Sequence, residues 1–184
     1  MKKICYLILK LFNFNVDLDH LPQEKKYVLV VAPHTSWADF ALGKIALKAM
    51  NIKTTFLMKK ELFFFPFGCY LRYLGGYPVD RKKASHLTDT LADYIKEKEE
   101  IAFLITPEGS RKRVENWKRG FYYIALKAEV PIALGYLDFG TRKGGVGPVF
   151  YPTGDYESDL KEIQDFYRGM KGRKKGRFNL EIDN

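Results

Sequence analysis

The chain has 184 residues, and its 31 Lys and Arg against 22 Asp and Glu give a formal net charge of +9. This length suits one domain with a single core, since domains commonly run to about 100–200 residues. Apolar residues make up 46% of the chain, which excludes a disordered basic tail. The longest apolar stretches, 4–9 and 62–67, fall well short of the ~18 residues that cross a bilayer, so we expect no membrane-spanning segment.

The excess of basic residues fits three kinds of partner: nucleic acid, an anionic membrane surface, or an acidic protein or substrate. Composition alone leaves all three open. Cys5 and Cys69 provide neither a disulfide framework nor the spacing of metal ligands, which favours a reducing compartment.

Residues 1–14 place Lys2, Lys3 and Lys10 around an apolar stripe. The segment lacks the longer apolar core and the small-residue cleavage site of a signal peptide. Two interpretations remain open. One is an interfacial helix within residues 1–20 that lies flat on lipid, and the other is a first helix packed on the protein's own core.

Strands and helices alternate along the following sequence, as judged from β-branched runs and from apolar residues at helical spacing. The predicted elements, in chain order, are a strand at 27–32, a helix at 37–50, a strand at 54–58, a broken helix at 61–74, a helix at 85–99, a strand at 101–106, a helix at 121–128, a strand at 131–139, a turn over 141–147, a strand at 148–151 and a helix at 159–167. The C-terminal segment 171–184 begins with a basic run and is expected to be mobile.

This alternation predicts an α/β fold in which helices flank a mostly parallel central sheet, within a single domain over 1–184. Ligands of such sheets bind beyond the C-terminal ends of the strands. Two segments rich in reactive side chains, 34–39 and 108–113, directly follow predicted strands. We therefore expect the functional site to involve these two segments.

The first of these segments contains His34, Ser36 and Asp39. A His held by a carboxylate has one tautomer fixed and its imidazolium stabilised, which suits a general base. Positions i and i+5 of a continuous helix lie about 140° apart, so such a pair requires His34 to lie in a loop before the helix. A second interpretation stays open, because Ser36 and Asp39 also have the spacing of a capping box.

The second segment reads Pro-Glu-Gly-Ser-Arg over 107–111, followed by two more basic residues. Glycine lets the backbone approach a ligand closely, and the fork of an Arg side chain suits phosphate or carboxylate oxygens. The alternative is a solvated basic turn. A third segment, 75–81, places Arg81 after a glycine pair and is a weak signal by itself.

Together these segments resemble the glycerolipid acyltransferase family, whose bacterial members include 1-acyl-glycerol-3-phosphate acyltransferases. The His-x4-Asp pattern of that family stands at 34–39, and its Pro-Glu-Gly-Thr/Ser-Arg pattern stands at 107–111. Its second block, an apolar stretch that ends in Arg, resembles 77–81, and its Val-Pro-Ile strand resembles 130–132. Four blocks in the family's order are far more specific than any one of them.

The resemblance implies that His34 is the general base, which takes a proton from an acceptor hydroxyl as that hydroxyl attacks an acyl thioester. It implies that Asp39 orients and charge-balances His34. The residues implied in binding the acceptor head group, a glycerol phosphate in the family, are Glu108, Gly109, Ser110, Arg111 and Arg81.

The same resemblance implies that no metal or cofactor is needed, with acyl-CoA or an acyl carrier protein thioester as co-substrate. The implied acceptor is a lyso-lipid of phospholipid biosynthesis, first of all 1-acyl-glycerol-3-phosphate, with an amino-acid lipid that lacks phosphate as the alternative. An anionic membrane surface is the implied partner, with the protein peripheral on the cytoplasmic side of the cell membrane.

The rival classes are non-catalytic: a membrane-binding or a nucleic-acid-binding protein. The Phe-rich stretch 62–67 is free of basic residues, which argues against nucleic acid.

That Phe-rich stretch carries four Phe within 63–67. Core packing is the default interpretation of such a run. Four Phe within five residues cannot all face one core at helical spacing. A position along an acyl-chain track or at a membrane-facing rim is the alternative.

Overall fold

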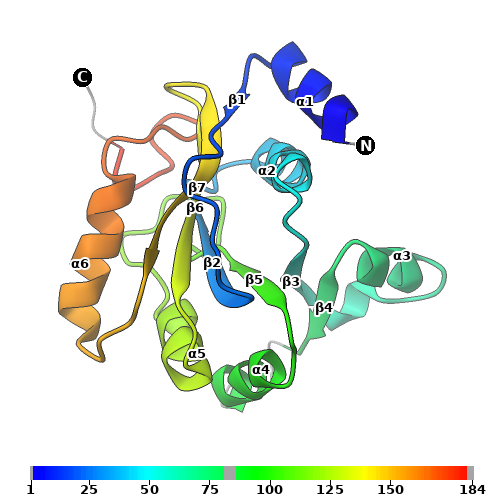
Figure 1. Cartoon of the computed structure of the whole chain (residues 1–184), viewed down its shortest axis with the longest axis vertical. Coiled ribbons are helices and arrows are strands. Elements are labelled where there is room, and N and C mark those ends of the chain that lie inside the picture. Colours follow the sequence, from blue (N-terminus) through cyan, green and yellow to red (C-terminus); the bar gives the residue numbers. More distant parts are fainter. Residues whose placement is uncertain (1, 81–85, 182–184) are drawn as a thin grey trace.

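The computed structural model describes residues 2–80 and 86–181, and its strands form one sheet (Figure 1). The strands are β1 (Asn15–Val16), β2 (Lys26–Ala32), β3 (Thr54–Lys59), β4 (Gly76–Val79), β5 (Ile101–Ile105), β6 (Ile132–Asp138) and β7 (Lys143–Phe150). Across the described part of the sheet their order is β1-β7-β6-β2-β5-β3-β4, and only β6 and β7 pair antiparallel. The predicted α/β fold with a mostly parallel central sheet is confirmed.

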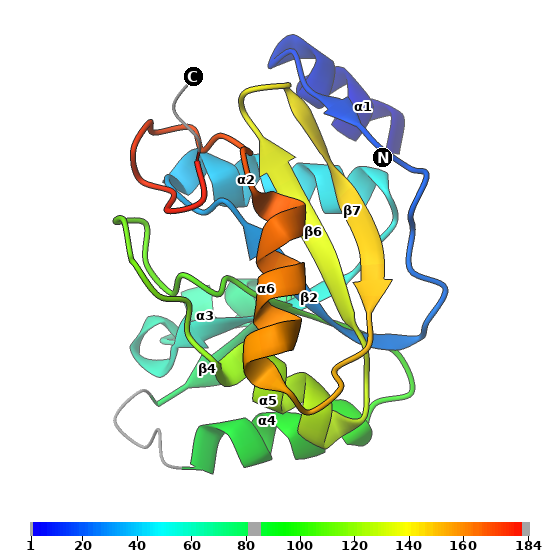
Figure 2. The same ribbon diagram turned by 90° about the vertical axis from the view of Figure 1, so that its left-hand side faces the viewer.

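Helices cover both faces of this sheet, as Figures 1 and 2 show. They are α1 (Lys2–Leu11), α2 (Trp37–Ala49), the 3-10 turn η1 (Lys60–Leu62), α3 (Phe67–Tyr73), α4 (Leu87–Lys96), α5 (Gly120–Ala128) and α6 (Tyr156–Tyr167). One buried cluster joins the sheet to α1 and α2, and a larger one joins it to α4, α5 and α6.

The central strand β2 shows why the sheet is covered on both faces. Successive side chains of a strand point to opposite faces. Val28 and Val30 therefore pack toward α4, α5 and α6, whereas Tyr27 and Leu29 pack toward α1 and α2. All four side chains are buried, which is why β2 is a continuous apolar run in the sequence and not an alternating one.

The strand β7 corrects one prediction, because residues 143–147 belong to it and not to a turn. Its glycines permit close packing. A Cβ at Gly147 would lie 2.3 Å from Cζ of Phe166 in α6, and a Cβ at Gly144 would lie 2.8 Å from Cδ1 of Leu137 in β6. Glycine in a strand thus marks the close approach of a neighbour, although in sequence it suggests a turn.

The first helix, α1, has one buried apolar face and one exposed apolar face. Cys5 and Leu9 are buried in the cluster that includes α2. Ile4, Leu7 and Leu11 are exposed, so a second apolar face of the helix has no cover from the described residues. The helix therefore packs on the core through a narrow stripe and presents apolar side chains outward.

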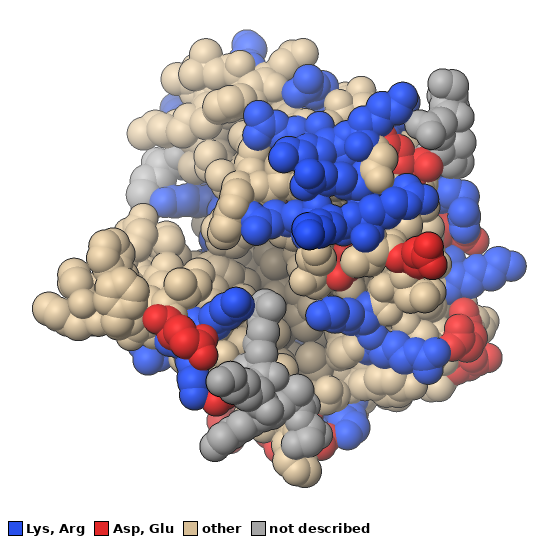
Figure 3. All heavy atoms as spheres, turned by 180° about the vertical axis from the view of Figure 1, so that it is seen from behind, with Lys and Arg blue, Asp and Glu red and all other residues tan. Residues whose placement is uncertain are grey.

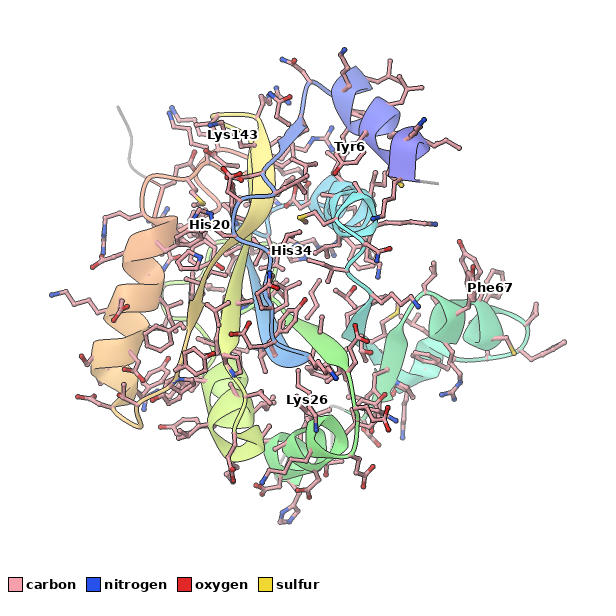
Figure 4. All side chains as sticks on the ribbon, viewed as in Figure 1. Tyr6, His20, Lys26, His34, Phe67 and Lys143 are labelled. Atoms are coloured by element: carbon pink, nitrogen blue, oxygen red, sulfur yellow. The ribbon has the colours of Figure 1, made fainter. Side chains whose placement is uncertain are left out.

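The Phe-rich stretch lies mostly on the surface. Phe64, Phe65 and Phe67 are exposed, Phe65 to 87%, and Phe63 is half-buried. The helix α3 that follows projects from the body of the protein, with Phe67 at its start (Figure 4). Tyr73 at its end is 85% exposed. Core packing therefore does not account for this stretch.

The C-terminal segment was expected to be mobile, whereas residues 171–181 are docked on the body of the protein. The backbone N–H of Phe139 donates to the carbonyl of Lys171 at 2.9 Å. Phe178 is fully buried in the core cluster that contains Trp117. The burial of this aromatic ring gives the segment a fixed attachment that its basic composition does not indicate.

Candidate active site

Two loops meet at the C-terminal ends of neighbouring parallel strands: the first motif loop (33–36) after β2 and the second motif loop (106–119) after β5. Val30 of β2 lies opposite Ile105 of β5, so the residues that follow these strands come together. The backbone N–H of His34 donates to both carboxyl oxygens of Glu108, at 3.1 Å to Oε1 and 3.0 Å to Oε2. Figure 4 shows His34 beside the end of β2. The structure thus joins the two segments that the sequence analysis singled out.

Asp39 lies in the first turn of α2, where it forms a capping box with the N-cap residue Ser36. Its carboxylate accepts hydrogen bonds from the backbone N–H groups of Thr35, at 2.5 Å, and Ser36, at 2.6 Å. The Ser36 hydroxyl donates to the other carboxylate oxygen at 2.5 Å. The capping interpretation is therefore confirmed. The hydrogen bonds of Asp39 go to Thr35 and Ser36, and the carboxylate acts on His34 as a nearby charge.

His34 is half-buried, and this burial lowers the pKa of its imidazole below the ordinary value. The negative charge of Asp39 raises the pKa, and the positive charge of Arg111 lowers it again. The balance is a lowered pKa, which favours the neutral form of the ring. A neutral imidazole is the form that accepts a proton.

Glu108 is only 3% exposed, and burial raises the pKa of its carboxyl to about 8. The hydrogen bond from the His34 backbone lowers this pKa, and the charge of Asp39 raises it. At neutral pH the carboxyl is therefore mostly protonated, which avoids the cost of an isolated buried charge. The resemblance implies a role in acceptor binding. The structure places the side chain beneath the first motif loop, where it holds the backbone of His34.

The guanidinium of Arg111 lies over the ring of Trp37, with 3.9 Å between Cζ and the ring centroid. Trp37 is the first residue of α2 and is 75% exposed. A guanidinium stacked on an indole keeps its edge donors free for an anion. Trp37 thus orients the side chain of Arg111. The sequence did not indicate this role, because an aromatic residue at a helix start is no functional signal by itself.

Gly109 and Ser110 shape the backbone before Arg111. Gly109 has a φ of +60°, in the left-handed region that favours glycine, and a Cβ there would lie 2.8 Å from Cε of Lys118. The hydroxyl of Ser110 accepts a hydrogen bond from the backbone N–H of Lys112 at 3.1 Å. Arg81 lies outside the described residues, so its predicted role in binding the acceptor stays a prediction.

The arrangement can deprotonate a hydroxyl and hold an anion close to it. His34 supplies a base of lowered pKa, Asp39 a negative charge that stabilises the imidazolium once formed, and Arg111 a cation whose N–H groups suit an anion. Among residues 2–80 and 86–181, no group of three or more His, Cys, Asp or Glu is placed to hold a metal ion. That a reaction here needs no metal stays a prediction.

The sequence of this chain is similar to those of known proteins. The sequence model of the family described as "Acyltransferase" matches residues 13–133, about two thirds of the chain. This chain belongs to the acyltransferase family. The resemblance drawn from the four sequence blocks is thereby confirmed, and the matched range contains the first motif loop, Asp39 and all of the second motif loop.

One relative of this acyltransferase-family chain is a 1-acyl-sn-glycerol-3-phosphate acyltransferase from Streptococcus pneumoniae, which is 29% identical over 136 residues. The aligned residues cover 72% of this chain and 50% of the relative. The chain thus spans about half the length of that protein. The crystal structure of PlsC from Thermotoga maritima, a 1-acyl-sn-glycerophosphate (LPA) acyltransferase, matches with a TM-score of 0.64 and 20% identity. The match covers 90% of this chain and 74% of the PlsC chain, and it shows that the two proteins share a fold.

Proposed function

We propose that this acyltransferase-family chain is an O-acyltransferase that moves an acyl group from a thioester to the hydroxyl of a lyso-lipid, first of all 1-acyl-glycerol-3-phosphate. The observation that carries the proposal is the position of His34. Its backbone donates to Glu108, burial lowers the pKa of its ring, and Asp39 and Arg111 both act on it as nearby charges. The activity in the name of the Streptococcus pneumoniae relative supports the choice of reaction.

In the proposed reaction, His34 accepts the proton of the acceptor hydroxyl while that oxygen bonds to the thioester carbonyl carbon. The resulting tetrahedral adduct collapses with cleavage of the carbon–sulfur bond, and the imidazolium returns its proton to the departing thiolate. The products are an ester and a free thiol. General base catalysis of this kind contributes about 10²–10⁴ in rate. Asp39 stabilises the imidazolium between the two proton transfers.

The acceptor phosphate is assigned to Arg111. Its guanidinium is stacked on Trp37 and so presents its donors as a planar fork, which suits phosphate oxygens. Gly109 and Ser110 set the backbone that carries it. Acyl-CoA and an acyl carrier protein thioester are both acidic donors, and both suit a basic surface such as the band of Lys and Arg on the face drawn in Figure 3.

The membrane is proposed as the source of the acceptor, with the protein bound peripherally to its cytoplasmic side. No helix within the described residues is both long and apolar enough to cross a membrane. The exposed apolar face of α1 and the exposed aromatic side chains of the Phe-rich stretch and of α3 support an interfacial contact. Lys2, Lys3 and Lys10 are exposed on α1, where they suit an anionic lipid surface.

The test is a thiol-release assay with wild type and the His34→Ala variant on a panel of lyso-lipids, including an amino-acid lipid without phosphate. We expect wild-type thiol release only in the presence of acceptor, highest with 1-acyl-glycerol-3-phosphate, and loss of that release in the variant. Wild-type release no higher than that of His34→Ala on every acceptor would contradict the proposal. Vesicle binding without any thiol release would instead indicate a non-catalytic membrane-binding protein.

A further inference from the structure

Residues 169–180 form a closed loop beyond α6, outside the range that the family comparison matches. The backbone N–H of Gly169 donates to the carbonyl of Leu180 at 2.9 Å, so the two ends of the segment lie together. Phe178 is fully buried and anchors the segment in the core. A compact surface loop with joined ends and an internal anchor is an Ω-loop, a type that frequently has a function.

This loop contacts the first motif loop. The backbone N–H of Lys174 donates to Oγ1 of Thr35 at 3.2 Å. Gly172 lies so close that a Cβ on it would be 2.4 Å from Cγ2 of Thr35. Thr35 is fully buried, and both its backbone N–H and its hydroxyl donate to Oδ2 of Asp39. The position of the Ω-loop therefore determines where Thr35 holds Asp39.

The same loop contacts the second motif loop. Nη1 of Arg177 donates to the carbonyl of Arg111 at 3.3 Å. In return, Nη1 of Arg113 donates to the carbonyl of Phe178 at 3.3 Å. Arg111 is the residue whose guanidinium lies over Trp37. Arg177 therefore fixes the backbone from which the phosphate-binding side chain of the proposed function extends.

We propose that the Ω-loop 169–180 is a clamp that sets the distance between the two halves of the active site, with Arg177 as the positioning residue for Arg111 and Gly172 as the positioning residue for Thr35 and Asp39. The proposal rests on the proposed acyl transfer for its kinetic consequences. Its geometric content, that Arg177 holds Arg111 over Trp37, stands independently of the reaction.

The first test changes Arg177 to Ala and to Lys. Loosening Arg111 should raise the KM for 1-acyl-glycerol-3-phosphate about 10-fold with little change in kcat, since a misplacement of about 1 Å can cost up to ~100-fold. The KM for a lyso-lipid without phosphate should not change. Arg177→Lys retains a donor for the Arg111 carbonyl and should restore part of the loss. Arg168→Ala, which removes an exposed arginine paired with Asp165, is the matched control.

A spectroscopic measurement separates this inference from the proposed function. Trp37 is exposed beneath Arg111, whereas Trp117 is 4% exposed, so acrylamide quenching of fluorescence reports mainly on Trp37. We expect Arg177→Ala to increase the quenching and Arg168→Ala to leave it unchanged. Unchanged quenching in Arg177→Ala would overturn the clamp whether or not the enzyme transfers acyl groups. An equal rise in KM for acceptors with and without phosphate would also overturn it, because it would indicate a general structural effect.

The second test uses the contact between Gly172 and Thr35. Gly172→Ala places a methyl group against Thr35, which we expect to lower kcat about 10-fold by displacing the first motif loop, whose Thr35 holds Asp39. Thr35→Ser removes the methyl group nearest to that Cβ and keeps the hydroxyl, so the double variant should regain part of the lost kcat. Gly120→Ala, where a Cβ meets no atom within 4 Å, is the matched control. A full kcat in Gly172→Ala, or a double variant no better than the single one, would contradict the role of Gly172.

Discussion

The backbone N–H of His34 donates to both carboxyl oxygens of Glu108, and this contact joins the loops that follow two neighbouring parallel strands. Glu108 is buried, and its pKa is raised to about 8, so the carboxyl is mostly neutral at the pH where the site would work. Glu108, which the sequence suggests as a ligand for substrate, thus supports the backbone of the first motif loop.

Glu108→Gln tests this support through the pH dependence of stability. The carboxyl binds its proton more tightly in the folded state than in the unfolded state, where its pKa is near 4.5. Folding stability is therefore lost as pH rises from about 5 to about 8, by an amount on the order of 3 kcal/mol for this group. Gln keeps an acceptor for the His34 N–H and does not titrate. Denaturant unfolding at several pH values should show a smaller loss of stability with rising pH in Glu108→Gln than in wild type.

Asp39→Asn tests the charge beside His34. Removal of the negative charge lowers the pKa of His34, because Asp39 raises it in the native protein. The acidic limb of the kcat profile, which follows formation of the neutral imidazole, should move to lower pH. The imidazolium formed during the reaction also loses its stabilisation, so kcat should fall by about 10²-fold or more. A thiol-release profile with an unmoved acidic limb would show that the charge of Asp39 does not act on His34.

The same substitution tests the capping box. The Asp39 carboxylate accepts from two backbone N–H groups and a hydroxyl, and the amide of Asn supplies only one accepting oxygen. We expect Asp39→Asn to lower the free energy of unfolding by about 1–3 kcal/mol. His34→Ala, measured beside it, removes no acceptor of these bonds and serves as the control for stability.

Trp37 and Arg111 should act as a unit in binding the acceptor phosphate. Trp37→Leu removes the ring beneath the guanidinium, and Arg111→Lys removes both the planar fork and the stacking. Each change should raise the KM for a phosphate-bearing acceptor about 10-fold, because the loss of a charge-assisted contact costs about 1.5–3 kcal/mol. In the double variant the two losses should not add, since the interaction is shared. Additive losses would indicate that Trp37 acts independently of Arg111.

The exposed aromatic residues of the α3 region should contribute to membrane binding. Phe65→Ser combined with Tyr73→Ser removes two rings that are 87% and 85% exposed. We expect weaker binding to anionic vesicles in a sedimentation assay, with thermal stability changed by less than about 0.5 kcal/mol. Leu18→Ser, at an exposed apolar residue outside α1 and α3, is the control. Vesicle binding equal to that of wild type would show that α3 does not contact lipid.

Much of the fold could be predicted because its strands are buried on both faces. The central strands β2, β5 and β6 are apolar runs, and their positions along the chain fix the alternation with helices. The edge strand β4 and the N-terminal part of β7 escaped prediction. β4 contains Pro78, which an edge strand tolerates, and β7 contains Gly144, Gly145 and Gly147, whose role depends on neighbours that lie far away in sequence.

The sequence by itself determined which chemical groups the site contains. His34, Asp39 and the 107–111 segment stand in the order of a known family, and the capping box of Ser36 and Asp39 is a local pattern within four residues. Local patterns of this kind are readable because the interacting atoms are close in the chain.

Only the tertiary structure decided what these groups contact. Burial of Glu108 beneath His34, the stacking of Arg111 on Trp37, and the docking of the Ω-loop on Thr35 join residues that are 74 to 139 positions apart in the chain. Such contacts depend on the pairing of β2 with β5 and on the burial of Phe178, which bring distant segments to one edge of the sheet. The tertiary structure also decides where part of the +9 net charge lies, because the basic C-terminal segment packs against the two motif loops.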